Sequence, residues 1–520
     1  MTVTNTLTAL DNFIREELPR VINESLPQIA PIFSDIESSS IDVVRNEGIG
    51  RGWKVIHLFS TGVAGLIEYA NPAGPAMLGG SSSDNLSVLN PVGTDFAPFP
   101  TASESPHTGN IKRELTLHKM VGNFSIPIEW MQLDALSATQ IKQVARDIKA
   151  VGELRAITEA ASLFGYAVAN AGGYMVDVLG RISAIAEKGS TDYINITLNE
   201  TYGRIHNFRP GMRIDVVADS SGVIQTGTDP DGTDVRNYTH TTNVYVWLIV
   251  DSVDYLNKII TLRPIHSVLG TTPNYGSGSS GDVFAVAAAA NDWLVVSRCS
   301  RYTAGTRPLH SWGFEDWLKG SGLIMGGAAL AGGLDLDTFP QFKSQVVAVN
   351  GPLTDTVMNT YLGGYLDSYP GVSLDTIITT TGVTQKYIEQ ASLYNNRMIY
   401  DRTGKALSIA GGWQTVGYSF NGRELKWIVN PMGLKNRLYA LKLAGGNIKR
   451  YVPPKIGGAD ARIGNEIEFV GPLTGHSGIF LESRASTGAV QDIIEAPFWQ
   501  YKLIAPIDVR GCKFTDVTEA

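Results

Sequence analysis

Several short stretches of this sequence have the letters of a known chemical site. Gly276–Gly281 spells G-x-G-x-x-G, which binds dinucleotide phosphates where it joins a strand to a helix. Here it lies in a Gly/Ser loop between expected strands and no suitable helix follows, so a plain loop is favoured. Asp229, Asp231 and Asp234 surround Gly232 as in a calcium loop, but no Glu stands at the expected distance. A polar hairpin turn is therefore favoured there.

The remaining candidates for chemistry are equally incomplete. Gly475–Gly478 (GHSG) lacks the spacing of a nucleophile elbow and is typical of a turn. The eight His are scattered, without an H-E-x-x-H pattern or a Cys/His cluster at ligand spacing. The sequence therefore predicts no catalytic residues, no cofactor and no metal site, and we expect that the protein is not an enzyme.

One charge pattern stands out in this acidic chain. No acidic residue occurs from Lys426 to Lys455, although the net charge of the whole chain is −8. Basic side chains in this stretch could face a nucleic acid or an acidic rim on a neighbouring subunit. Runs of charge are more often simply solvated faces of strands. The candidate basic patch consists of Lys435, Arg437, Lys442, Lys449 and Arg450.

Composition restricts the class of protein. A chain of 520 residues can form about three or four domains, and its hydrophobic fraction of 43% is that of an ordinary soluble protein. The net charge argues against a dedicated nucleic-acid or membrane-surface binder. Cys299 and Cys512 lie far apart, which indicates reduced thiols. There is no secretory signal, and the longest apolar stretch, 322–334, is too short to span a bilayer. We expect a cytoplasmic protein.

A long amphipathic helix is the element around which the chain is organised. Ser137 and Gln140 fit a capping box, and apolar residues then recur every three or four positions to about Ala169. At about 1.5 Å per residue an unbroken helix would be roughly 50 Å long. Gly152 is its weakest position, because Gly costs about 1 kcal/mol relative to Ala in a helix.

Two apolar segments precede this helix. Residues 1–46 predict an amphipathic helix and a second short apolar piece, which Pro19 and Pro27 separate. This arm has no core of its own, so it must lie on its own body or on a neighbour. After a strand at Trp53–Phe59, a segment reaching Asn110 is too long for a compact domain and too apolar for a linker. Either another chain buries it, or it is an active-site lid. Its apolar side chains include Leu66, Ile67, Met77, Leu78, Phe96 and Phe99.

The rest of the chain combines strands and helices. Arg113–Trp130 predicts two strands that lead to the long helix. Between 192 and 297, five strands with no helix between them predict a small barrel or sandwich inserted in a larger α/β body. These strands are YINITL, MRIDVVA, VYVWLIVDSV, KIITLRPI and DVFAVAA. Helices at Thr354–Leu366 and Thr384–Tyr394 follow, and the last strands, up to Val509, are expected to pair with those beside the long helix.

Three stretches carry a family resemblance through their order and spacing. They are Arg113–Trp130 running on to the long helix, Ser373–Thr380 with Gln385–Tyr387, and Val416–Pro431 with its Asn421–Gly422 turn. None is a strict motif. In this order the chain resembles the major capsid protein of tailed bacteriophages, which has the Hong Kong 97-like (Johnson) fold.

The resemblance implies an α+β fold of the Hong Kong 97-like capsid type, in six parts. These are an N-terminal arm (1–46), an extended E-loop (53–112), a peripheral domain with the spine helix (113–190), an inserted small β-barrel-like domain (192–297), an axial domain (301–450), and C-terminal strands returning to the peripheral domain (451–520). The inserted domain departs from the minimal family pattern, so its role is the least defined.

The resemblance also implies a function. The subunit would self-assemble, as hexamers and pentamers, into an icosahedral head shell around a double-stranded DNA genome, without contact to a membrane. Scaffold, portal and decoration proteins would be partners, and the virion, assembled in the host bacterial cytoplasm, would be its location. The apolar E-loop residues would then be intersubunit contacts. Some family members form Lys–Asn isopeptide bonds from an E-loop Lys, but residues 55–111 contain no Lys. The alternatives are an encapsulin-like nanocompartment shell and a cytosolic multidomain enzyme with a long lid loop.

Overall fold

The structure is a computed structural model. It describes residues 3–46, 52–60, 110–127, 138–170, 173–187, 194–217, 246–266, 290–296, 313–324, 334–369, 371–395, 417–420, 423–454, 467–469, 481–484 and 490–519. The chain forms two compact units, one made of Met1–Val55 with Thr116–Ala520 and the other of Ile56–Leu115. The second unit leaves on β3 (Gly52–Ser60) and returns on β4 (Asn110–Thr116), which pair with each other.

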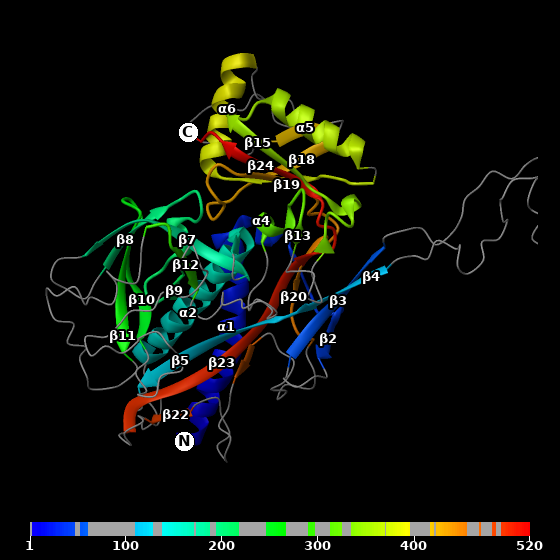
Figure 1. The fold of residues 1–520 in the computed structure, drawn as a ribbon. Coiled ribbons are helices and arrows are strands. Elements are labelled where there is room, and N and C mark those ends of the chain that lie inside the picture. Colours follow the sequence, from blue (N-terminus) through cyan, green and yellow to red (C-terminus); the bar gives the residue numbers. More distant parts are fainter. Residues whose placement is uncertain are drawn as a thin grey trace, which may run out of the picture. The chain divides into compact units, whose positions relative to one another are not determined.

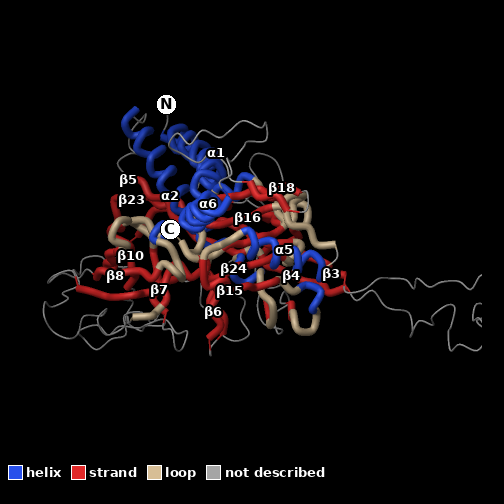
Figure 2. The backbone as a smooth tube through the Cα atoms, turned by 90° about the horizontal axis from the view of Figure 1, so that it is seen from above, coloured by secondary structure: helices blue, strands red, loops and turns tan. Residues whose placement is uncertain are grey.

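Two long helices lie side by side in the first unit. They are α1 (Val3–Ile29) and α2 (Ala138–Phe164), and Figure 2 shows them next to each other. The long helix predicted from Ser137 is thus confirmed, although it ends at Phe164 and a strand follows. Gly152 permits the close approach of the two helices, because a Cβ there would lie 2.6 Å from Cγ1 of Val21, which would have to shift.

The arm differs from the prediction at its two prolines. Pro19 and Pro27 do not separate two pieces, because α1 runs through both. A buried stripe at every fourth residue packs the part of α1 from 14 to 26, and this burial outweighs the roughly 3 kcal/mol that an interior Pro costs. The stripe consists of Ile14, Leu18, Ile22 and Leu26. These side chains are therefore covered by the subunit itself and are not offered to a neighbour.

A six-stranded sheet joins the ends of the chain beside α2. Its order is β1-β20-β23-β21, and β22 and β5 also pair with β23. The main ladder is antiparallel, from Ile493 opposite Pro127 to Lys502 opposite His118, and Figure 1 shows both strands running together. This confirms that the last strands pair with those before the long helix. The strands are β1 (Glu37–Ser39), β5 (His118–Pro127), β20 (Ile448–Tyr451), β21 (Ile467–Phe469), β22 (Leu481–Arg484) and β23 (Val490–Pro506).

The inserted block is a small closed barrel. Its sheet runs β12-β9-β10-β11-β8-β7-β6, and a further pairing of β12 with β7 closes six of these strands. The strands are β6 (Tyr166–Asn170), β7 (Gly173–Glu187), β8 (Ile194–Asn199), β9 (Arg213–Val217), β10 (Val246–Asp254), β11 (Ile259–His266) and β12 (Trp293–Val296). The inserted domain was predicted to start at residue 192, and this boundary leaves out β7, the strand that closes the barrel by pairing with β12. DVFAVAA lies outside the described residues, and β12 was not predicted.

The first unit also contains a mixed sheet of six strands. Its order is β15-β24-β19-β16-β18-β17, and α5 and α6 pack together on one face, with Met358, Tyr387 and Phe514 in their common core. The bounds are β15 (Gln345–Gly351), α5 (Asp355–Ser368), β16 (Thr376–Thr379), α6 (Thr381–Asn395), β17 (Gly417–Phe420), β18 (Arg423–Val429), β19 (Leu438–Leu441) and β24 (Gly511–Val517). Both predicted helices are confirmed.

The end of the chain changes sheets. Residues 451–520 were expected to return to the strands beside the long helix, and β23 does so. β24 instead pairs with β15 and β19 in the mixed sheet. The chain crosses between the sheets at 507–510, where Asn447 receives a hydrogen bond from the backbone of Asp508. The two sheets are therefore joined by one continuous stretch of chain.

Candidate functional site

Most residues predicted to do chemistry or to form contacts lie outside the described residues. This applies to the six apolar E-loop residues, and to Gly276–Gly281, the Asp229–Asp234 turn and Gly475–Gly478. In the part of the chain that the structure describes, no group of three or more His, Cys, Asp or Glu could hold a metal ion. No described helix is long and apolar enough to cross a membrane.

The predicted basic patch is not one exposed surface. Arg437 and Arg450 are only 8% and 3% exposed, because each neutralises a buried carboxylate. Lys435 and Lys449 reach carboxylates too, with Nζ 3.8 Å from Glu200 and from Asp42 respectively. Lys442 is exposed. All four partner carboxylates lie outside residues 426–455. The sequence of this stretch alone therefore could not show that its basic residues are paired.

The first of the two buried ionic networks is centred on Glu159 in α2. Its carboxylate is fully buried, accepts hydrogen bonds from Arg450 and lies 2.9 Å from Nζ of Lys502. Burial alone would raise its pKa, but the charges of Arg450 and Lys502 outweigh this and lower the pKa of Glu159 to about 2. Arg450 also donates to Oδ1 of Asn23, so one guanidinium ties together α1, α2 and β20.

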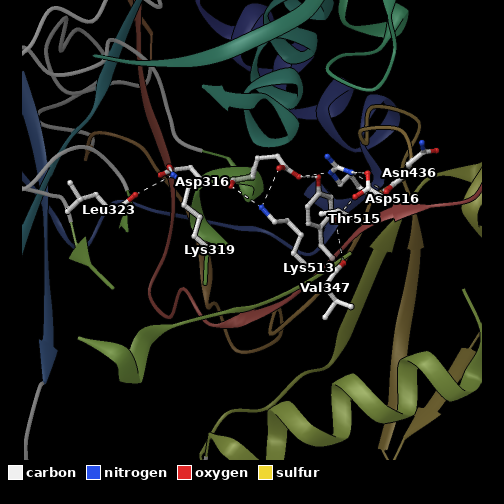
Figure 3. A network of polar contacts seen from close by, with 11 residues as sticks. Asp316, Lys319, Leu323, Val347, Asn436, Lys513, Thr515 and Asp516 are labelled. Carbon is white, nitrogen blue, oxygen red and sulfur yellow. Dashed lines mark hydrogen bonds and ion pairs between the residues drawn. The ribbon is translucent and has the colours of Figure 1, made fainter. Parts of the chain in front are cut away.

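The second network is centred on Glu315 in α4 (Phe314–Trp317) and lies on the face of the mixed sheet opposite α5 and α6. The Tyr439 hydroxyl donates to Oε1 of Glu315 at 2.8 Å, and Nζ of Lys513 donates to Oε2 at 3.3 Å. Nε of Arg437 lies 3.5 Å from the same carboxylate, and Asp516 is 3.7 Å from its other end. Figure 3 shows how Lys513 and Asp516 of β24 converge on this network.

Aromatic packing around α4 joins the networks. The Phe314 ring is 5.3 Å from the rings of both Phe164, at the end of α2, and Tyr439, in β19. Gly313 permits this approach, because a Cβ there would lie 2.5 Å from the carbonyl oxygen of Leu163. Glu315 thus lies where α4 packs between the end of α2 and the mixed sheet. The sequence did contain a signal for the buried Glu159 network, because Glu159 interrupts a run of small and apolar residues.

These networks join separate elements of the fold. Both carboxylates are buried and compensated by fixed cations, so neither is positioned to exchange a proton with a substrate. Burial raises the pKa of the Cys512 thiol far above its usual range, which makes it a poor nucleophile. An open pocket of about 540 Å³ lies nearby and is mainly polar. Its lining residues are Thr201, Asn350, Lys435, Asn436, Asp516, Val517, Thr518 and Glu519.

Comparisons with known proteins give weak likenesses. No family model and no curated protein matches the sequence. Among solved structures, a cyanophage A-1(L) capsid asymmetric unit aligns with a TM-score of 0.37 and 10% identity, over 94% of this chain and 93% of that chain. The holo-SrpI encapsulin complex from Synechococcus elongatus PCC 7942 aligns with a TM-score of 0.21 and 11% identity, over 33% of this chain and 53% of the encapsulin chain. The second match therefore spans about half of the encapsulin's length.

Proposed function

We propose that this chain is a shell-forming structural protein, the major capsid protein of a tailed phage. Its subunits assemble as hexamers and pentamers into an icosahedral head that encloses double-stranded DNA. Scaffold, portal and decoration proteins are its expected partners. Assembly takes place in the host bacterial cytoplasm, and the finished protein resides in the virion.

The observation that carries this proposal is the separate unit Ile56–Leu115. It leaves and returns on two paired strands, and its sequence is too apolar for a free linker. The apolar side chains of this segment need a surface to cover them, and a neighbouring copy of the chain provides one. Contacts of this kind can each stay weak, because a closed shell makes many of them at once.

The rest of the architecture supports the same function. A shell subunit must transmit load between its contacts without deforming, so its parts have to be joined rigidly. The Glu159 network ties α1 and α2 to the β5–β23 sheet, and the Glu315 network ties α4 to the mixed sheet. An enzyme with a lid would instead need a set of accessible reactive groups, whereas the carboxylates of Glu159 and Glu315 are held in buried ion pairs.

Particle size and content test this proposal. The purified chain should elute in the void volume of a sizing column and form closed shells in electron micrographs. Particles made during infection should hold double-stranded DNA. A small discrete oligomer would favour the enzyme, and shells filled with protein cargo in place of DNA would favour an encapsulin-like compartment.

A double substitution tests the role of the E-loop. Leu66→Asp with Ile67→Asp should leave the circular-dichroism spectrum unchanged but abolish shells, because an interface cannot bury two unpaired carboxylates cheaply. The matched control, Leu66→Met with Ile67→Leu, should assemble. If the double Asp variant loses its fold and precipitates, these side chains belong to the core of the subunit itself.

A further inference from the structure

The turn between β10 and β11 of the barrel is locally rigid. Oδ1 of Asp254 accepts hydrogen bonds from the backbone N–H of Leu256 at 3.0 Å and of Asn257 at 3.1 Å. Its Oδ2 accepts a third from the Asn257 side chain at 2.7 Å. On the other side of the turn, Nζ of Lys258 lies 2.6 Å from Glu200. A turn held in this way loses little conformational entropy when it meets a partner.

This rigid turn presents two adjacent apolar side chains to solvent. Leu256 is 87% exposed and Tyr255 is 42% exposed. Arg209 holds the Tyr255 ring in place by donating to its hydroxyl, and its guanidinium lies 5.2 Å from the ring centre. Single exposed apolar residues are common and need no explanation. Leu256 is not such a single residue, because Tyr255 and Arg209 lie beside it. Tyr and Arg are among the residue types that contribute most often to the binding energy of protein interfaces.

The surroundings of the turn carry surplus positive charge. Arg204, Arg209, Lys258 and Lys435 are four cations, against three carboxylates, Glu200, Asp251 and Asp254, which leaves a local charge of about +1. Burial first, and then Arg204 and Arg209, lower the pKa of nearby His206, as a cationic environment should. In the described part of the chain, no carboxylate forms an ion pair with Arg209.

We propose that this turn, with Leu256 at its tip and Arg209 beside it, docks on an acidic surface of a neighbouring copy of the chain. The chain carries a net charge of −8, so a second copy offers acidic surface to a basic tip. Two such tips would repel each other, so the tip must meet a different patch on its neighbour. Where such a contact is heterologous, it can close into rings and shells. The proposal rests on the proposed shell function.

A protein partner fits this surface better than a nucleic acid does. Single strands are bound by stacking platforms and by long grooves of positive charge. Here the most exposed side chain is an aliphatic Leu, and the Tyr255 ring already lies against Arg209 and stacks with His206 at 6.0 Å. The tip therefore offers an apolar anchor with a charged rim, as protein interfaces do.

The test uses Leu256→Asp and its matched control Leu256→Met in the full-length chain. Thermal melting should be unchanged in both, because the side chain makes almost no contact within the subunit. Assembly, followed by light scattering over a range of subunit concentrations, should need at least about tenfold more Leu256→Asp than wild type. Leu256→Met should assemble like wild type. Arg209→Ala should weaken assembly and make it less sensitive to added salt.

The outcomes separate this proposal from the shell function. A wild-type chain that never assembles overturns the proposed function. A wild-type chain that assembles, with Leu256→Asp assembling at the same concentration, overturns the docking tip and leaves the shell function standing. If Leu256→Asp melts at a lower temperature than wild type, Leu256→Ser, which adds no charge, is measured in its place. Assembly of Leu256→Ser at the wild-type concentration then overturns the docking tip. Tip variants that lose binding to a DNA duplex while assembling normally also overturn the proposal.

Discussion

Glu159→Gln is the change that most directly tests how the subunit is held together. The substitution keeps the size of the side chain but removes its charge, which leaves Arg450 and Lys502 buried without a counter-ion. Breaking a buried ion pair in this way typically costs about 3–5 kcal/mol. The pKa of Glu159 supports a similar figure, because a fall from 4.5 to about 2 corresponds to about 3 kcal/mol.

The pH dependence gives a second readout of the same interaction. The pKa of Glu159 is lower in the folded chain than in the unfolded chain, so its contribution is complete above about pH 4.5. That contribution is lost as the pH falls toward about 2, where the folded carboxylate takes up its proton. The Gln variant has no such group. Its free energy of unfolding should therefore fall less steeply than that of wild type over this range.

Urea unfolding of unassembled subunits, at one fixed protein concentration, measures both effects. Glu153→Gln is the matched control on the same helix, since Glu153 pairs with Lys149 at 3.7 Å on the exposed face. Removing that pair should cost less than about 1 kcal/mol. If Glu159→Gln costs no more than Glu153→Gln and keeps the wild-type pH dependence, the ion pairs of Glu159 do not stabilise the subunit.

Three further predictions follow from other parts of the chain. Boiled, denatured particles should migrate as a single band of monomer mass, because residues 55–111 contain no Lys for isopeptide bonds; a ladder of multimers would contradict this. An excised fragment 173–297 should fold cooperatively by circular dichroism, whereas 192–297 should not, because only the longer one contains β7. Equal folding of both would show that β7 is dispensable. Gly203→Ala should destabilise the subunit by about 1–3 kcal/mol or more, since its Cβ would lie 2.1 Å from the carbonyl oxygen of Leu179. Gly364→Ala, in an open position of α5, should be neutral or stabilising by up to about 1 kcal/mol in the same urea assay.

Local patterns in the sequence were sufficient wherever a single element decides its own conformation. The apolar period of three to four residues predicted α2 to within one residue at its start. The helices predicted at Thr354–Leu366 and Thr384–Tyr394 agree with α5 and α6 to within three residues at each end. Turn residues and alternation also located β8, β9, β10 and β11. These features depend on neighbours a few positions away, which the sequence displays directly.

Only the tertiary structure decided which distant segments meet. Pro19 lies within α1 because packing on α2 outweighs a local preference. β7 closes the barrel by pairing with β12, and β24 pairs with β19 in the mixed sheet although it directly follows β23. Both pairings depend on partners far along the chain, which local patterns do not reveal. Arg437 and Arg450 looked like surface charge because their carboxylates, Glu315 and Glu159, lie outside the basic run. A charge count records how many ions a segment has, but burial and pairing arise only when the chain folds.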